Sequence, residues 1–110
     1  MRKCIPLVVI CAWLASCASH DEPEPNCNNI NVSFATDIKP IIEMNCLINN
    51  SECHGMNPSI PNWAIFSEVQ SHAGLIKTKT RDRSMPKIGS LTQSQIDLIT
   101  CWVDNGAKDN

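Results

Sequence analysis

Residues 46–55 read Cys46-LINNSE-Cys53-His54-Gly55, two cysteines with a histidine directly after the second. Chains that attach haem covalently carry the pattern Cys-x-x-Cys-His. In that pattern the thiols form thioethers with the haem vinyl groups, and the histidine becomes an axial iron ligand. Here six residues separate the cysteines instead of two. The stretch is compatible with an extended haem-attachment site or with a small disulfide loop that precedes a histidine.

The N-terminal residues have the features of an export signal. Arg2 and Lys3 precede an apolar run over residues 5–14, which is too short to span a bilayer. The run ends in LASC at residues 14–17, which resembles the lipobox of bacterial lipoproteins. We therefore expect residues 1–16 to be a signal peptide and Cys17 to be lipidated, which would give lasting membrane attachment. A plain secretory signal cut elsewhere is the alternative.

The chain after the signal divides by composition into a tether and one small domain. Residues 17–31 are acidic and proline-rich and predict an extended tether, and residues 32–110 predict the domain. A domain this small is expected to need a disulfide or a cofactor. The formal net charge of −2 gives no support for nucleic-acid binding. The expected location is the periplasmic side of a bacterial membrane or the cell surface, where cysteine pairs persist.

Apolar periodicity predicts a small all-α domain with three main helices. The first is expected over residues 36–46, with Thr36 as its cap and Pro40 unusually late for a first turn. The second is expected to begin after Asn62 and to end at residues 72–74. Its apolar positions recur at helical spacing, at Trp63, Phe66 and Val69.

The third predicted helix has the clearest end signals. Thr92 and Gln95 form a capping box at its start, and Gly106 suits the left-handed position after its end. The apolar residues between them predict an inward stripe, formed by Ile96, Ile99 and Val103 and widened by Leu98 and Trp102. Residues 57–62 and 76–90 are expected to be loops.

The order of these motifs resembles that of a small class I-type cytochrome c domain of the kind found on bacterial lipoproteins. The resemblance covers residues 32–106. It consists of the first helix with Cys46 and Cys53-His54-Gly55, then Ser84-Met85-Pro86 and Gly89, then the helix through Trp102. It implies a cytochrome c-like fold, in which the helices and long loops surround a haem. It also implies that the last helix crosses the first at its aromatic residue.

The resemblance implies one haem c, attached through Cys46 and Cys53, with His54 and Met85 as axial ligands. This ligand pair raises the reduction potential and favours electron transfer. The second ring nitrogen of His54 is expected to donate to a backbone carbonyl. Since six-coordinate iron has no open position, we expect an electron carrier and no enzyme activity. Its partners would be redox proteins, with no small-molecule substrate.

Other residues compete with Met85 for the iron. Met44 lies on the first predicted helix, and Met56 is too close to His54 to reach the opposite haem face. His72 offers bis-histidine ligation as a minority alternative. Trp63, Phe66 and Trp102 are expected to be core or haem-wall residues.

The remaining cysteines and the basic residues allow two interpretations each. Cys27 and Cys101 are expected to form a disulfide, with two free thiols as the alternative. Basic residues alternate before Met85, a pattern typical of a solvated extended face. Alternatively, Arg81 or Arg83 neutralises a haem propionate and the rest steer an acidic redox partner. The full basic set is Lys77, Lys79, Arg81, Arg83 and Lys87.

Two further classes of protein compete with the haem carrier. One is a non-haem lipoprotein with a binding or structural role and a Cys46–Cys53 disulfide. The other is a zinc site built on Cys46, Cys53 and His54, which lacks a second Cys/His pair at suitable spacing. A peroxidase would need an open iron position, and the Met85-Pro86 loop argues against it.

Overall fold

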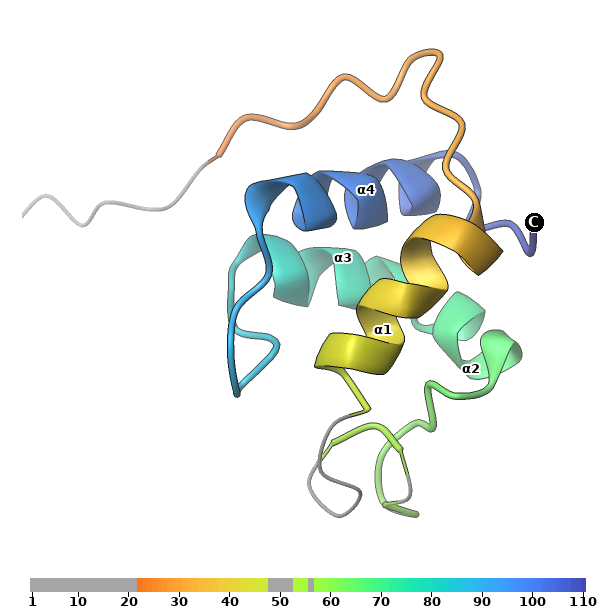
Figure 1. Cartoon of the computed structure of the whole chain (residues 1–110), viewed down its shortest axis with the longest axis vertical. Helices are drawn as coiled ribbons and strands as arrows, with labels where there is room; N and C mark the ends of the chain where they lie inside the picture. Colours follow the sequence, from red (N-terminus) through yellow and green to blue (C-terminus); the bar gives the residue numbers. More distant parts are fainter. Residues whose placement is uncertain (1–21, 48–52, 56) are drawn as a thin grey trace, which may run out of the picture.

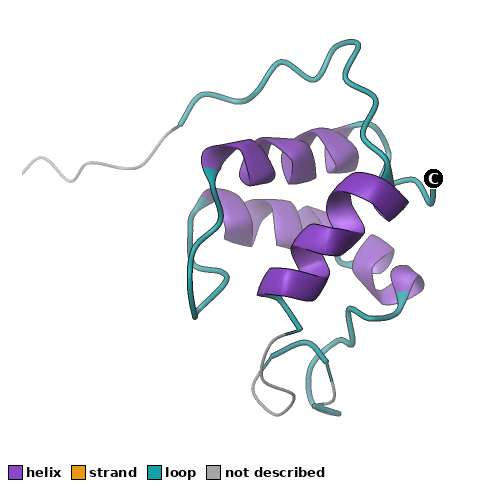
Figure 2. Ribbon diagram, in the orientation of Figure 1, coloured by secondary structure: helices purple, strands orange, loops and turns teal. Residues whose placement is uncertain are grey.

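The computed structural model describes residues 22–47, 53–55 and 57–110, and this part of the chain is all-α. Figure 2 shows helices joined by loops, with no strand in the described ranges. No described helix is both long and apolar enough to cross a bilayer. The predicted signal peptide, Cys17 and Met56 lie outside the described residues. The elements are η1 (Phe34–Ile38), α1 (Lys39–Asn45), α2 (Phe66–Ser71), α3 (Ala73–Arg81) and α4 (Gln93–Asp104).

The first helix begins at Phe34, two residues earlier than predicted, and Ser33 is its cap instead of Thr36. The Ser33 hydroxyl accepts a hydrogen bond from the Thr36 N–H, and the Asp37 carboxylate accepts one from the Ser33 N–H at 2.8 Å. The turn η1 is π-helical, and the Lys39 N–H donates to the Phe34 carbonyl. Pro40 then falls in the first turn of α1, where its missing N–H is tolerated.

The region after Asn62 differs most from the prediction, because it forms two helices where one helix and a loop were expected. Helix α2 begins only at Phe66, and Gly74, expected near the end of that helix, lies inside α3. The predicted loop over residues 76–90 is therefore wrong for residues 76–81. The buried positions of α3 are Ala73, Ile76 and Thr80, a helical spacing that the alternating basic residues concealed.

Helix α4 confirms its predicted ends. The Thr92 hydroxyl accepts from the Gln95 N–H at 3.2 Å, and the Gln95 side chain accepts from the Thr92 N–H at 2.9 Å. At the other end Gly106 has a φ of +103°. Its N–H donates to Val103, and the next N–H donates to Trp102, which closes the helix in a Schellman motif.

The first and last helices cross, and aromatic rings fill the crossing. Phe34 of η1 lies 5.5 Å from Trp102 of α4 and 4.7 Å from Phe66 of α2, measured between ring centroids. Trp102 is 2% exposed. Figure 1 shows the helical stretch of η1 and α1 lying across α4 and α3, which run side by side, and η1 is the part that packs against α4. This crossing agrees with the expected position of the aromatic residue, and it holds η1 against the core.

A disulfide joins Cys27 to Cys101 on α4, as predicted, across a sequence separation of 74 residues. The described part of the predicted tether continues beside α4 (Figure 1) and is bonded to the helices. Glu24 forms ion pairs with Lys77 at 3.2 Å and with Arg81 at 3.5 Å. The Asn105 side chain donates to the Ile30 carbonyl at 2.9 Å. Residues 22–30 therefore form a strap over α3 and α4.

Candidate functional site

One pocket brings Met85 together with the Cys46, Cys53 and His54 motif. Its lining combines the end of α1, the segment around His54 and the Met85 loop, and the space between these segments is partly open to solvent. The lining residues are Asn45, Cys46, Cys53, His54, Trp63, Met85, Pro86, Lys87 and Ile88.

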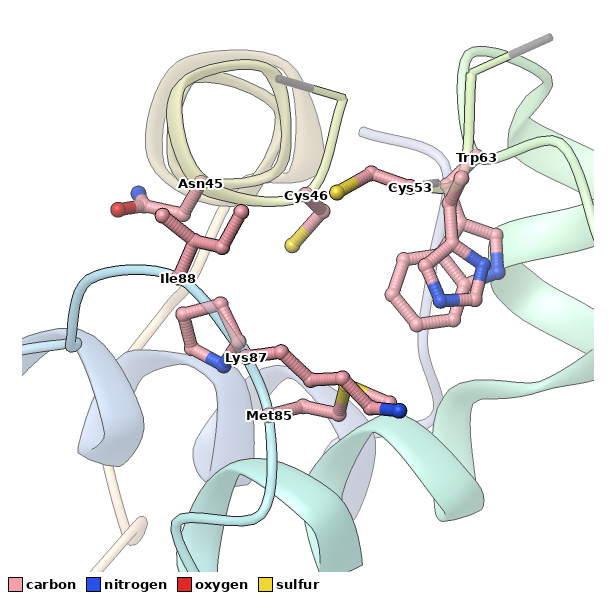
Figure 3. A pocket seen from close by; sticks show the side chains of 9 residues that line it. Asn45, Cys46, Cys53, Trp63, Met85, Lys87 and Ile88 are labelled. Carbon is pink, nitrogen blue, oxygen red and sulfur yellow. The ribbon is translucent and has the colours of Figure 1, made fainter. Parts of the chain in front are cut away.

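The two ends of the Cys46–His54 stretch meet despite its extra residues. The His54 N–H donates to the Cys46 carbonyl at 3.0 Å, directly across the stretch. Both thiols are free, and Figure 3 shows the two sulfur atoms directed toward the pocket from one side. The disulfide alternative for Cys46 and Cys53 is therefore absent from the structure. The predicted turn at residues 49–51 lies outside the described residues.

Burial keeps the Cys46 thiol protonated. Desolvation, with a smaller contribution from the neighbouring Cys53, raises the pKa of Cys46 to about 11. The thiol is therefore neutral at physiological pH and behaves as an apolar pocket wall.

His54 is held with one ring nitrogen committed to the backbone, as predicted. Its Nδ1 lies 3.0 Å from the Pro61 carbonyl oxygen, which can only accept, so Nδ1 carries the proton and donates. Burial lowers the pKa of His54, with the Pro61 hydrogen bond opposing the shift and His72 adding to it. A neutral imidazole with a protonated Nδ1 leaves the Nε2 lone pair for a metal.

Trp63 covers one face of the His54 ring. The two ring centroids are 3.4 Å apart and the ring planes differ by 6°. The backbone N–H of Trp63 also donates to the His54 carbonyl at 2.8 Å. Trp63 is 8% exposed, and its buried Nε1 has no hydrogen-bond partner among the described residues.

Met85 faces the cysteines from the opposite side of the pocket. In Figure 3 the Met85 side chain lies across the pocket from Cys46. Its N–H donates to the Lys79 carbonyl at 3.0 Å, which ties the Met85 loop to the end of α3. The backbone N–H of the preceding Ser84 donates to the Asp82 carboxylate at 2.8 Å. Hydrogen bonding from the side chain and the backbone of Ser84 lowers the pKa of Asp82.

Neither predicted propionate partner lines the pocket. Arg81 donates to the Glu22 carbonyl at 2.8 Å and pairs with Glu24, so its side chain belongs to the strap. Arg83 donates to the Gln93 side chain at 2.7 Å. Lys87 is the basic residue of the pocket lining, and Figure 3 shows its side chain extended beside Met85.

The competing iron ligands lie elsewhere. Met44 is 71% exposed on α1. His72 is the residue between α2 and α3, and its Nδ1 lies 2.8 Å from the Glu68 carbonyl oxygen. Neither is part of the pocket lining, which contains Met85 and His54.

Sequence reasoning missed two lining residues, Asn45 and Ile88. Asn45 precedes the first cysteine on α1, and its side chain donates to the Ile41 carbonyl at 2.8 Å. Ile88 is 55% exposed, although it is a large apolar side chain. Their positions beside Cys46 and Met85 in the sequence were the only available signals.

Within the described ranges, no three His, Cys, Asp or Glu side chains cluster closely enough to hold one metal ion. Cys46, Cys53 and His54 border the same pocket. Comparison of the chain with protein-family models, with curated proteins and with solved structures found no match.

Proposed function

We propose that this chain is a membrane-tethered c-type cytochrome that carries single electrons through one covalently attached haem. The observation that carries the proposal is the convergence of Cys46, Cys53, His54 and Met85 on one pocket. These residues come from two parts of the sequence more than thirty positions apart. Two thiols, an imidazole and a thioether are the donor set of a His/Met-ligated haem c.

The residues of the pocket fit such a group. Cys46 and Cys53 would hold it through thioethers to the two vinyl groups, and His54 and Met85 would be the axial ligands. The pocket walls are mainly apolar, which favours a macrocycle over a hydrated ion. Trp63 Nε1, buried without a partner in the described part of the chain, is a donor that a bound polar group would satisfy.

Each residue has a defined task in this proposal. When bound, the haem supplies an iron that alternates between the ferrous and ferric states by one electron. His54 offers Nε2 because the Pro61 carbonyl holds the proton on Nδ1. Met85 contributes a soft thioether, which favours the ferrous state and raises the potential. With His54 and Met85 both bound to the iron, the site would have no place for a substrate.

The remaining parts of the proposal concern fold and location. The helix crossing at Phe34 and Trp102 supports a cytochrome c-like arrangement of the helices around the pocket. The predicted signal and a lipidated Cys17 support export and attachment to a bacterial membrane, with redox proteins as partners. The Cys27–Cys101 disulfide is consistent with an oxidising compartment.

The visible spectrum of the protein tests the proposal. The chain is produced in an exporting host with a haem-maturation system, and the spectrum is taken before and after dithionite. Sharp bands are expected in the spectrum of the reduced protein. The haem is expected to remain with the protein after acid-acetone extraction. A purified protein without such bands would contradict the proposal.

Met85→Ala tests the sixth ligand in the same preparation. The reduction potential is expected to fall, and the ferric protein is expected to bind added imidazole or cyanide readily. Met44→Ala is the matched control and is expected to leave both properties unchanged. An unchanged potential in Met85→Ala would assign the sixth position to another residue.

A further inference from the structure

Two residues, Pro61 and Trp63, hold His54 through three contacts. The Pro61 carbonyl accepts a hydrogen bond from Nδ1 of the imidazole at 3.0 Å. The backbone N–H of Trp63 donates to the His54 carbonyl at 2.8 Å, which fixes the backbone of the histidine. The Trp63 indole then stacks on the imidazole, with 3.4 Å between centroids and 6° between planes.

These contacts constrain different motions of the imidazole. A single hydrogen bond at Nδ1 fixes one edge of the ring but permits the ring to rock about that bond. A parallel indole against the ring face restricts the rocking, because a tilt toward the indole would bring the two rings into a steric clash. Trp63 can serve as this wall because it is itself 8% exposed and held in the core.

The orientation of the imidazole matters for the proposed iron site. The plane of an axial imidazole determines which iron d orbital its π system overlaps. The splitting of those orbitals sets the anisotropy of the ferric electron spin and contributes to the reduction potential. Groups behind a ligating histidine commonly fix its ring orientation and tune the metal in this way.

We infer that Trp63 is the positioning residue for His54 and sets the plane of the axial imidazole by stacking on it. The inference rests on the proposed haem function. Trp63 does not touch the iron and acts only through the histidine. The Pro61 hydrogen bond fixes the tautomer, whereas the Trp63 stack fixes the plane, so the two contacts have separable effects.

The test compares haem-loaded variants by electron paramagnetic resonance of the ferric protein and by potentiometry. Trp63→Leu removes the aromatic face and is expected to shift the principal g values and broaden the spectrum. Trp63→Phe keeps an aromatic face and is expected to retain g values near those of the wild type. Trp102→Phe is the matched control, since Trp102 is also a buried tryptophan but does not line the pocket. It is expected to lower the melting temperature and leave the g values unchanged.

A measurement on the unmodified protein covers the case in which Trp63→Leu fails to fold. In the reduced, diamagnetic protein, nuclear Overhauser cross-peaks between the Trp63 indole and the His54 ring protons are expected. Their absence overturns the inference, as does a folded Trp63→Leu variant with wild-type g values. A wild-type protein that contains no haem refutes the proposed function instead, so the two failures are distinguishable.

Discussion

The two pairs of cysteines in the folded part of the chain differ in their bonding state. Cys27 and Cys101 are 74 positions apart and form a disulfide, whereas Cys46 and Cys53 are seven positions apart and remain free thiols. The bonded pair joins the strap to the last turn of α4, and the free pair lines a pocket. Proximity in sequence thus does not decide which thiols pair. The geometry of the helices brings the distant pair into contact and leaves the local pair available to a ligand.

The largest expected effect comes from removing the free pair. Cys46→Ala combined with Cys53→Ala should abolish covalent haem, because no thiol remains in the pocket to form a thioether. Intact-protein mass spectrometry and acid-acetone extraction measure the attachment. Cys27→Ala is the control and should retain the haem. Haem that stays covalently bound in the double variant would contradict the assignment.

The single variants determine how many bonds the wild type makes. Cys46→Ala and Cys53→Ala should each keep haem through one thioether. The remaining vinyl group stays conjugated, so the pyridine haemochrome band should move to longer wavelength. A wild type whose band coincides with that of a single variant would have only one thioether.

The second largest effect is expected from the bonded pair. Cys27→Ala opens a loop of about 75 residues, which costs about 4 kcal/mol of unfolding free energy by loop-closure entropy. Urea unfolding measures this loss, with the exposed neighbour Asn28→Ala as the control. The haem spectrum should not change, because neither disulfide cysteine lines the pocket. Equal stability of the two variants would show that the disulfide contributes nothing to the fold.

A smaller effect is expected at the start of α4, the helix that carries Cys101. Thr92→Ala removes the hydroxyl that caps the Gln95 N–H and should cost about 1 kcal/mol. Ser94→Ala, an exposed change in the first turn of the same helix, is the control and should be close to neutral. Chemical unfolding at neutral pH compares them. A Thr92→Ala protein as stable as Ser94→Ala would contradict the importance of the capping box.

The smallest effect is expected from the ion pairs of the strap. Lys77→Gln breaks contacts with Glu24 and Asp104 and should cost less than about 1 kcal/mol, since exposed pairs are weak. The hydrogen bond to Asp104 is the main reason that the pKa of Lys77 is raised above 10.5. Folding therefore gains from the protonated lysine below pH 10.5, and this gain is lost as the pH rises through the raised value.

Unfolding free energies of wild type and Lys77→Gln, measured at low and high salt, check this contribution. The difference should shrink at 1 M salt, where exposed charges are screened. Lys79→Gln is the control, because Lys79 is on the same helix but has no ion pair among the described residues. A difference that persists at high salt would show that Lys77 acts through packing.

Local signals in the sequence were sufficient to predict the ends of α4 and to single out Cys46, Cys53, His54 and Met85 as candidate site residues. The capping box needs only Thr92 and Gln95, and the helix end needs only a glycine that accepts a positive φ. The error at the first helix has a local cause as well. Ser33 and Asp37 form the cap. The π-helical turn η1 ends before Pro40, so Pro40 falls in the first turn of α1, which the pattern of a single regular helix does not predict.

The alternating basic residues illustrate the limit of pattern reasoning. Lys77, Lys79 and Arg81 alternate as an exposed strand would, yet they lie on α3. The helix forms because Ala73, Ile76 and Thr80 lie on one face and are buried. The spacing of the basic residues gives no indication of this buried face. Lys77 and Arg81 are four positions apart, so they share one helix face and bind the strap.

The sequence by itself determined the all-α class, the capped last helix and the residue types of the candidate site. These follow from contacts between residues a few positions apart, which periodicity records. Only the tertiary structure decided that α3 is a helix, that the ends of the Cys46–His54 stretch meet, and that Trp63 stacks on His54. Those features depend on surfaces and hydrogen bonds that form when distant segments pack together, and no local pattern encodes that packing.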